Sequence, residues 1–527
     1  MTDFSQLYKR LKNFPEQSLT TFEKGRYIVR PYPDLCDEVE VIMARLVRAG
    51  VRSGMRVGIL SENRYEWLLY DWALAALDCV SVAFPEDYAA SGLQTLIETY
   101  ELVLIVSNKT LLKQAELPEK GLLLFDEAPR EGETIVAPQP DGLMKREDEL
   151  SNCFSTGTAG SSKGLLISGR GTARIITDCM GLYGLGQGDS ILVFMPLTAF
   201  QQRFFTYAGP LMGLSIHLIK PLHLFRAMKD LSPNIIIGPP SLFEAIYEQA
   251  MPKRALPALL VNLLNRGLRR LPRALGDPIR RRVYAKLLAC FGDRVKVMLC
   301  GMAKTSPATI RFFRDVGLPL YEVYGLIETG LVAANTGDAL KIGTVGKAFP
   351  GCRIKIAADG EVLVRKEEMV ARAYIQTIGS LREPHYFEEW FPTGDMGDLD
   401  EDGFLTLRGR KDNTIVTDSG HKIQPEVLEA RLEAFGGVKR AVVFGGGGLT
   451  CLTAVIVTDG EAELRPKIKA AIDKLNRSVE QWCEIGAVVY ADSPFSMENG
   501  LLNRGLKVNR NKVFETYRTQ ILATESD

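Results

Sequence analysis

Residues 393–422, TGDMGDLDEDGFLTLRGRKDNTIVTDSGHK, combine several kinds of turn signal in one short stretch. An acidic TGD turn is followed by an Asp-Glu-Asp-Gly hairpin, a Gly-Arg-Lys-Asp junction and a second glycine turn. No single regular element accommodates so many breaks. The stretch therefore predicts a hinge between two parts of the chain.

The chain before this stretch alternates apolar runs with amphipathic patterns. Residues 55–60, 79–84 and 101–107 are short apolar runs, and Tyr65–Ala76 and Ser91–Tyr100 between them have helical spacing. This order predicts a βαβαβ unit. Further apolar runs of the same kind lie at Ile191–Met195, Ser215–Ile219, Asn234–Gly238 and Val295–Cys300. Buried parallel sheets covered by helices are the expected architecture.

The chain after Arg410 follows a different pattern. Its predicted elements are strands at Val438–Phe444, Leu449–Val457 and Ala487–Ala491 and a helix at Glu463–Val479. We therefore expect an α/β chain whose large N-terminal domain (1–410) holds parallel or mixed sheets flanked by helices. A small, mobile α+β domain (411–527) follows it. The linker is predicted within Gly409–Asp412, and the Pro- and Gly-rich stretch 126–148 is predicted to be a surface connection.

Length and composition limit the classes of protein that this chain can belong to. At 527 residues the chain exceeds what a single core usually holds. Its 64 basic residues balance 64 acidic ones, so no global field recruits nucleic acid or an anionic membrane, although local patches remain open. Nine cysteines without a C-x-x-C pair and four scattered histidines favour a reducing cytoplasm over a disulfide framework or a structural zinc site.

The sequence also bears on membranes and partners. The first residues lack the apolar core of a signal peptide, and no run of about 18 apolar residues occurs. We expect a cytoplasmic protein without a transmembrane segment, with peripheral membrane contact left open. An arginine cluster at 266–282 is either a solvated face or a docking surface for a carrier protein, phosphate groups or a membrane. The sequence does not indicate the oligomeric state.

A glycine-rich loop covers Ser155–Gly164 and follows a short apolar start. Its glycines let backbone N–H groups approach phosphate oxygens, its hydroxyls add donors, and Lys163 adds a positive charge. The spacing is not that of a Walker A loop. The loop is either a phosphate-binding segment or a flexible turn.

A second candidate segment is Tyr324-Gly325-Leu326-Ile327-Glu328. A carboxylate beside phosphate groups can anchor a hard cation that prefers oxygen ligands. The alternative is a buried tyrosine and a surface glutamate in an ordinary turn between strands.

With the segment 393–422, these two motifs resemble, in order and spacing, the adenylate-forming superfamily of acyl-CoA synthetases, nonribosomal adenylation domains and luciferases. The ending Asn499-Gly-Leu-Leu502 and the approach Arg311–Gly325 are most similar to long-chain acyl-CoA synthetases. The resemblance implies a Mg²⁺- and ATP-dependent ligase that converts a carboxylic acid to an acyl-adenylate and then transfers the acyl group to a thiol. CoA, the phosphopantetheine of an acyl-carrier protein or an amine is the implied acceptor. The competing interpretation is a non-catalytic nucleotide-binding homologue.

The resemblance also assigns roles to individual residues. Lys507 corresponds to the catalytic lysine that bridges the substrate carboxylate and the α-phosphate, and Glu328 to the Mg²⁺ ligand. Asp395 and Arg410 correspond to the residues that grip the ribose, and Asp412 to the hinge. The remaining nucleotide-binding positions are Ser155, Thr156, Gly157, Thr158, Gly160, Lys163, Gly301, Met302, Ala303, Tyr324 and Gly325. The substrate-pocket positions are Ala199, Phe200, Pro239 and Ile327.

Four positions depart from the family's pattern. In the glycine-rich loop, Ala159 replaces a threonine and Ser162 a proline. Ile327 replaces the threonine that donates to the adenylate, and Ala199 replaces a histidine of the acyl pocket. Loss of the hydroxyl and of the ring favours a specialised substrate.

Overall fold

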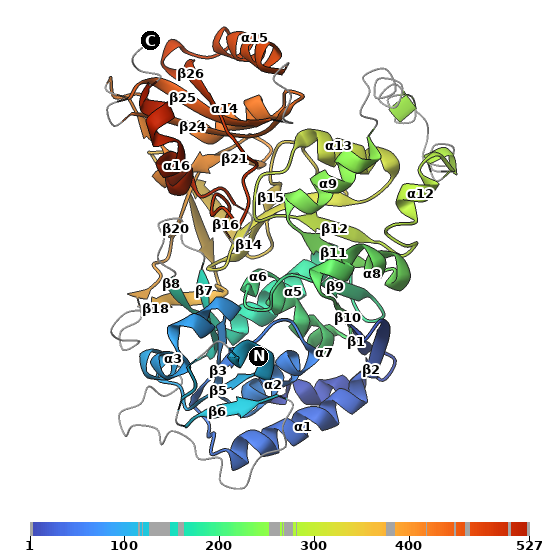
Figure 1. The fold of residues 1–527 in the computed structure, drawn as a ribbon. Helices are drawn as coiled ribbons and strands as arrows, with labels where there is room; N and C mark the ends of the chain where they lie inside the picture. Colours follow the sequence, from blue (N-terminus) through green and yellow to red (C-terminus); the bar gives the residue numbers. More distant parts are fainter. Residues whose placement is uncertain are drawn as a thin grey trace. The chain divides into compact units, whose positions relative to one another are not determined.

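The protein is described by a computed structural model, shown in Figure 1. The residues that it describes are 4–113, 116–118, 120–125, 148–155, 163–251, 264–265, 267, 278–280, 282–375, 385–417, 419–446, 449–458, 464–503 and 507–523. They form two compact units. Unit 1 consists of the described residues of 1–157, 162–353 and 365–389, and unit 2 of those of 354–364 and 390–527.

The first sheet of unit 1 has eight strands and confirms the predicted βαβαβ order. In spatial order they are β19 (His385–Tyr386), β18 (Ala371–Ile375), β8 (Lys163–Ser168), β7 (Glu149–Ser155), β4 (Val80–Phe84), β3 (Arg56–Leu60), β5 (Leu104–Ser107) and β6 (Leu122–Leu124). The strands from β7 to β6 are parallel. Helix α3 (Leu93–Tyr100) packs its apolar side on this sheet, with Leu96, Ile97 and Tyr100 in the core.

The second sheet of unit 1 has nine strands. In spatial order they are β15 (Lys347–Ala348), β14 (Gly330–Ala334), β13 (Leu320–Leu326), β12 (Val297–Cys300), β11 (Ile235–Gly238), β9 (Ser190–Val193), β10 (Ser215–Leu218), β1 (Ser18–Glu23) and β2 (Arg26–Pro31). The six strands from β13 to β1 are parallel. Three helices pack on this sheet: α8 (Leu224–Leu231), α9 (Pro240–Ala250) and α13 (Pro307–Val316). All four strands predicted in this region are present, each within two residues of its expected bounds.

Further helices surround the two sheets. They are α1 (Tyr32–Arg48), α2 (Tyr65–Ala76), α4 (Lys109–Leu112), α5 (Gly169–Leu182), α6 (Phe200–Arg203), α7 (Ala208–Met212) and α12 (Ala285–Leu288). Short 3-10 helices lie at η1 (Phe4–Gln6), η2 (Tyr8–Asn13), η3 (Glu86–Ser91), η4 (Phe204–Tyr207) and η5 (Pro221–His223). Helices α1 and α2 pack against each other (Figure 1). Helix α2 has the predicted bounds, and nine of its residues are buried, Trp67 and Trp72 among them.

A four-stranded sheet lies mainly in unit 2 and includes residues 393–410 of the stretch 393–422. Its strands are, in order, β16 (Cys352–Ile356), β17 (Glu361–Lys366), β20 (Phe391–Leu399) and β21 (Leu405–Arg410). The predicted hairpin is confirmed, because β20 and β21 pair antiparallel across residues 400–404. The predicted TGD turn is wrong: Thr393, Gly394 and Asp395 lie inside β20. Gly394 gives this strand a φ of +70° without a turn, and the ladder with β21 shifts register between Met396 and Gly397.

The carboxyl-terminal part of unit 2 is the expected α+β module. Strands β24 (Val438–Gly446), β25 (Leu449–Thr458) and β26 (Ile485–Tyr490) form a sheet, with α14 (Pro425–Glu433) and α15 (Arg465–Asn476) on one face and α16 (Arg510–Ala523) on the other. Smaller elements are β22 (Ile415–Val416), β23 (Lys422–Ile423), η6 (Lys411–Asn413) and η8 (Gln481–Cys483). The α/β fold class is thus confirmed. The boundary after Arg410 remains a prediction, and it falls inside unit 2.

Two further observations concern the described part of the chain. None of the helices in it is long and apolar enough to cross a bilayer. The predicted surface connection at 126–148 lies outside the described residues except for Asp148, and the arginine cluster lies outside them except for Arg280 and Arg282.

Candidate active site

Residues predicted to bind nucleotide and substrate gather at one edge of the nine-stranded sheet in unit 1. Pro239 directly follows β11, Gly301 directly follows β12, and Tyr324 lies near the end of β13. Ala199 and Phe200 come shortly after β9. These four strands are neighbours and run parallel, so their carboxyl ends meet at the same edge. In sheets of this kind that edge is where ligands bind.

The β13–β14 hairpin holds the segment Tyr324–Glu328. Tyr324 is 8% exposed. A side chain at Gly325 would bring its Cβ within 2.3 Å of the Gly330 carbonyl oxygen, so this close pairing requires glycine. Ile327 is half-buried in the turn between the strands. The hairpin thus places the predicted adenine-stacking ring near the end of β13 and the predicted metal ligand in the turn that follows it.

Two residues that the sequence did not reveal fix the Glu328 side of this hairpin. The Tyr374 hydroxyl donates to Glu328 Oε1 at 2.9 Å. Lys366 Nζ donates to the carbonyl oxygens of Thr329 at 3.0 Å and Leu331 at 2.9 Å, and burial lowers the pKa of Lys366 to about 8. A half-buried carboxylate held in this way is the kind of oxygen ligand that Mg²⁺ prefers, so Glu328 fits its predicted role chemically. Both partners lie on other strands about 40 residues away, and no local sequence pattern marks them.

The segment after β12 carries backbone strain. Met302 has a φ of +71°, a conformation that residues other than glycine rarely adopt. Such strain is maintained where the surrounding structure requires it, most often at binding sites. Gly301 is buried against Val323, whose carbonyl oxygen a Cβ would approach to 3.1 Å, and Ala303 is exposed. The strained residue therefore lies between a buried and an exposed position at the binding edge.

The side chain of Gln202 connects the carboxyl ends of β9 and β11, next to the residues of the predicted acyl pocket. Its Oε1 accepts from the backbone N–H groups of Phe194, at 2.8 Å, and Met195. Its Nε2 donates to the carbonyl oxygen of Ile237 at 3.0 Å. Because Phe194 follows β9 and Ile237 lies in β11, a single side chain ties two adjacent strands together. Phe200, two residues earlier, is 1% exposed.

A buried ion pair anchors the same short helix. Arg203 donates from Nε to Asp71 Oδ2 at 3.1 Å, from Nη1 to Ser151 Oγ at 2.9 Å and from Nη2 to Ser81 Oγ at 2.7 Å. The Tyr207 hydroxyl also donates to Asp71. Neither charged side chain is more than 1% exposed. Helix α6, which begins at the predicted pocket, is thereby fixed to α2 and to two strands of the other sheet.

Unit 2 brings together three predicted residues that are far apart in the sequence. Arg410 Nη1 donates to Asp395 Oδ1 and to the carbonyl oxygen of Thr393, both at 3.0 Å. Lys507 lies close enough for both charges to act on its pKa. The residue as a whole is exposed, but nearby protein atoms desolvate its ammonium group and so lower the pKa, which Asp395 acts to raise and Arg410 to lower. A Cβ at position 394 would lie 2.8 Å from Arg410 Nη2, so glycine leaves room for the guanidinium. A carboxylate and two cations thus form one polar cluster.

The predicted hinge residue lies next to a second ionic cluster in unit 2. Asp412 is exposed in η6. Its neighbour Lys411 pairs with Asp359 Oδ2 and Glu361 Oε2, each at 2.7 Å. Asn413 Nδ2 donates to Glu426 Oε1 at 2.6 Å. Lys411 and Asn413, the residues on either side of Asp412, are therefore both held by side-chain contacts.

The glycine-rich loop is only partly described. Ser155 ends β7 and Lys163 begins β8, and the two residues pair directly across the antiparallel ladder. The loop positions Thr156, Gly157, Thr158 and Gly160, with Ala159 and Ser162, lie outside the described residues.

Comparisons with known proteins agree with this architecture. The AMP-binding enzyme family matches residues 8–375, and the AMP-binding enzyme C-terminal domain matches residues 412–524. A long-chain-fatty-acid–CoA ligase, FadD15 of Mycobacterium bovis, is 28% identical over 93% of this chain and 91% of its own length. The peroxisomal long chain acyl-CoA synthetase 7 of Arabidopsis thaliana is 26% identical over 92% of this chain and 80% of its own.

Solved structures share the fold at lower sequence identity. An o-succinylbenzoate CoA synthetase (MenE) of Bacillus subtilis, in complex with its acyl-adenylate intermediate, has a TM-score of 0.73 at 17% identity, covering 97% of this chain and 98% of its own. ATP-bound MatB of Rhodopseudomonas palustris also has a TM-score of 0.73, at 19% identity, covering 98% of this chain and 99% of its own. The family match spans well over half of the sequence, from residue 8 to 375. The chain belongs to the AMP-binding enzyme family.

Proposed function

We propose that this protein is an ATP-dependent acid–thiol ligase. In the first step an oxygen of the substrate carboxylate attacks the α-phosphorus of ATP, the bond to the β-phosphate breaks, and pyrophosphate leaves. In the second step a thiol sulfur attacks the acyl carbon of the resulting acyl-adenylate, losing its proton, and AMP leaves. The products are a thioester, AMP and pyrophosphate.

The observation that best supports this proposal is the cluster of Asp395, Arg410 and Lys507. A carboxylate accepts from two vicinal ribose hydroxyls, and the guanidinium holds that carboxylate at 3.0 Å without competing for a proton. An ammonium group beside them stabilises negative charge that develops as the carboxylate attacks phosphorus. An Arg410–Asp395 pair with no function would not require a third charged residue nearby. Lys507 comes from a segment almost 100 positions further along the chain, which favours a functional cluster.

The other roles are proposed from the residues at the sheet edge. Tyr324 stacks on adenine, the loop with Lys163 holds the outer phosphates, and Gly301 to Ala303 line the nucleotide site. Glu328 would hold Mg²⁺, which when bound neutralises phosphate charge. Ala199, Phe200, Pro239 and Ile327 line the acid pocket.

The acid is proposed to be a fatty or related acyl acid, with CoA as the acceptor. The relatives named above, long-chain-fatty-acid–CoA ligases and acyl-CoA synthetases, support this choice. The alternatives are a carrier-protein phosphopantetheine or an amine as acceptor, and a non-catalytic nucleotide-binding homologue. Retention of the charged residues Lys163, Glu328, Asp395, Arg410 and Lys507 argues against the last. A cytoplasmic location is proposed because every cysteine that the structure describes is a free thiol.

A screen for pyrophosphate release tests the proposal. Wild-type protein is incubated with ATP, Mg²⁺ and aliphatic, aromatic or amino acids, with and without CoA. We expect acid-dependent release for a narrow group of acids and a thioester only when CoA is present. A non-catalytic homologue releases no pyrophosphate with any acid, and a carrier-protein ligase forms no CoA thioester.

Ile327→Thr distinguishes a weakened site from a specialised one. If a hydroxyl is merely missing, restoring it adds about 0.5–1.5 kcal/mol to transition-state binding, and adenylation rises by about tenfold at most. We favour the other outcome: Ile327 and Ala199 shape a pocket for an unusual acid, so the new hydroxyl is buried without a partner and slows the true reaction. The measurement is adenylation by both proteins across the acid panel. Faster adenylation of every acid by the variant would contradict the specialised pocket.

Rotation of the small domain about Asp412 is proposed between the two half-reactions. Proline at 412 fixes φ and disfavours a helical conformation at Lys411, so Asp412→Pro should trap one orientation. We expect one half-reaction to survive while overall thioester formation is lost. Asp412→Ala removes the carboxylate but leaves φ free and should keep the overall rate. If Asp412→Pro forms the thioester at the wild-type rate, Asp412 is not the hinge residue.

A further inference from the structure

The segment from β10 to the end of α8 exposes large apolar side chains on one side only. Leu224, Ala227 and Met228 form the inner face of α8 and pack in the core of unit 1. On the outer side Leu222, in η5, is 88% exposed and Phe225 is 51% exposed. These two residues lie three positions apart, so one side of the segment carries both. The fold leaves both side chains exposed to water, whereas the inner face of α8 is buried.

The hairpin of β1 and β2 continues this surface. The Phe22 ring lies 4.5 Å from the His223 ring, and the Arg226 guanidinium lies 4.9 Å from the Phe22 centroid. The Tyr27 hydroxyl donates to Asp230 Oδ2 at 3.1 Å. Side chains alternate along a strand, so residue 29 of β2 points to the same face as Tyr27. That residue is valine and is 60% exposed.

The charges around these apolar residues are mainly positive. Residues 22–30 and 220–230 contain six basic and two acidic side chains, in a chain whose net charge is zero. The two acids already have partners: Glu23 pairs with Arg30 at 3.0 Å, and Asp230 pairs with Arg226 at 3.2 Å. The remaining bases are the exposed residues Lys24, Arg26, Lys220 and Lys229. Burial raises the pKa of Glu86, and the positive charge of Lys220 opposes that rise.

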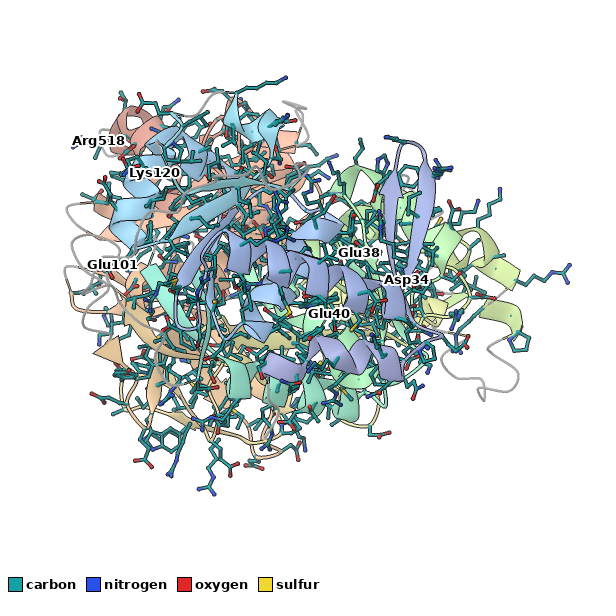
Figure 2. All side chains as sticks on the ribbon, turned by 90° about the horizontal axis from the view of Figure 1, so that it is seen from below. Asp34, Glu38, Glu40, Glu101, Lys120 and Arg518 are labelled. Atoms are coloured by element: carbon teal, nitrogen blue, oxygen red, sulfur yellow. The ribbon has the colours of Figure 1, made fainter. Side chains whose placement is uncertain are left out.

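An exposed apolar residue elsewhere on unit 1 has the opposite surroundings. Val41 of α1 is 66% exposed. The same helix carries Asp34, Glu38 and Glu40, which Figure 2 labels along its length. Single exposed apolar side chains are common on proteins. What distinguishes the surface of η5, α8 and the β1–β2 hairpin is that Leu222, Phe225 and Val29 coincide with a local excess of positive charge.

We propose that this surface, formed by η5, the outer side of α8 and the β1–β2 hairpin, docks on a bilayer that contains anionic phospholipids. Apolar side chains enter the boundary between headgroups and acyl chains, and lysine and arginine side chains contact lipid phosphates. The local positive charge complements an anionic membrane surface and selects it over a neutral one. Docking goes beyond the proposed ligase activity, but for a long-chain acid it would place the enzyme where such acids partition.

Sedimentation with lipid vesicles tests the docking. The full chain is mixed with vesicles of phosphatidylcholine alone or of an equimolar mixture with phosphatidylglycerol. We expect binding to the mixed vesicles that weakens with added salt, and much weaker binding to phosphatidylcholine alone. The double variant Leu222→Ser/Phe225→Ser should lower the partition coefficient about tenfold or more, because insertion strength follows buried apolar area.

Two control variants separate specific docking from general effects. Val41→Ser removes a comparably exposed apolar side chain from the acidic helix and should bind vesicles like the wild type. Lys220→Glu/Lys229→Glu should lose binding to the mixed vesicles. Equal loss with Val41→Ser, unchanged binding with Lys220→Glu/Lys229→Glu, or no wild-type binding to mixed vesicles would each overturn the proposal.

A second copy of this chain is the competing occupant of the surface. Light scattering of wild type and Leu222→Ser/Phe225→Ser distinguishes the two occupants, and we expect the same mass for both proteins. A dimer that becomes a monomer in the variant would assign the surface to self-association and overturn membrane docking. Pyrophosphate release with a water-soluble acid, measured without vesicles, tests the ligase activity separately, so failure of either proposal is recognised independently.

Discussion

Lys507→Ala is expected to lower acid-dependent pyrophosphate release by about 10²–10³-fold, the loss that follows removal of one charge-stabilising donor from a transition state. The same variant should form thioester from supplied acyl-adenylate at close to the wild-type rate. The reason is that Lys507 lies near Asp395 and Arg410, and we propose that this cluster acts while the carboxylate attacks phosphorus. Both half-reactions are measured on the same protein preparation.

The matched control for this variant is Lys512→Ala. Lys512 follows shortly in the same terminal segment, is exposed and pairs only loosely with Glu515, at 3.4 Å. Its removal should leave both half-reactions unchanged. Equal losses of the two half-reactions in Lys507→Ala would show that the lysine supports the fold or general binding and has no specific role in adenylation.

Arg203→Met is expected to destabilise unit 1 by about 3–5 kcal/mol, because it leaves the buried carboxylate of Asp71 without its cation. Urea unfolding followed by tryptophan fluorescence measures this effect. Trp67 and Trp72 are buried in the same helix as Asp71 and report its environment. The midpoint should fall with little change in the slope of the transition.

Arg174→Met provides the comparison for an exposed ion pair. Arg174 pairs with Asp178 at 2.7 Å, but its side chain is 45% exposed, so the loss should stay below about 1 kcal/mol. The double variant Asp71→Asn/Arg203→Met should regain part of the stability, since no uncompensated charge remains. If Arg203→Met loses no more unfolding free energy than Arg174→Met, the buried network of Arg203 and Asp71 does not stabilise unit 1 as proposed.

The elements that were predicted correctly from the sequence include strands whose side chains are all buried. The strands β3, β9 and β11 are buried on both faces and appear as continuous apolar runs, and α2 has clear bounds. Helices α14 and α16 were not predicted, because only three or four residues of each are buried and polar or charged residues occupy most of the other positions. The TGD turn was assigned wrongly because glycine's tolerance of positive φ also serves a strand with an irregular register.

In the candidate site, the sequence predicted residues that belong to local motifs but not the residues that contact them from other elements. Motif spacing placed Tyr324 and Glu328 in one segment, and parallel topology brought Pro239 and Gly301 to the same edge. Tyr374, Lys366 and Gln202 were missed because each acts through a hydrogen bond to a residue on another element. A lone tyrosine, lysine or glutamine in the sequence carries no sign of such a partner. The resemblance to a family names the residues that are expected to contact substrate, while the hydrogen-bond partners that position them emerge only from the fold.

The most direct test of the central claim follows the oxygen atoms of the acid. An acid identified in the pyrophosphate screen is labelled with ¹⁸O in both carboxylate oxygens and converted with ATP and CoA, and the AMP is analysed by mass spectrometry. Attack of the carboxylate on the α-phosphorus predicts AMP that carries one ¹⁸O, since the bridging oxygen of the adenylate leaves with AMP. Unlabelled AMP, or label in inorganic phosphate together with ADP, would contradict acyl-adenylate formation by this protein.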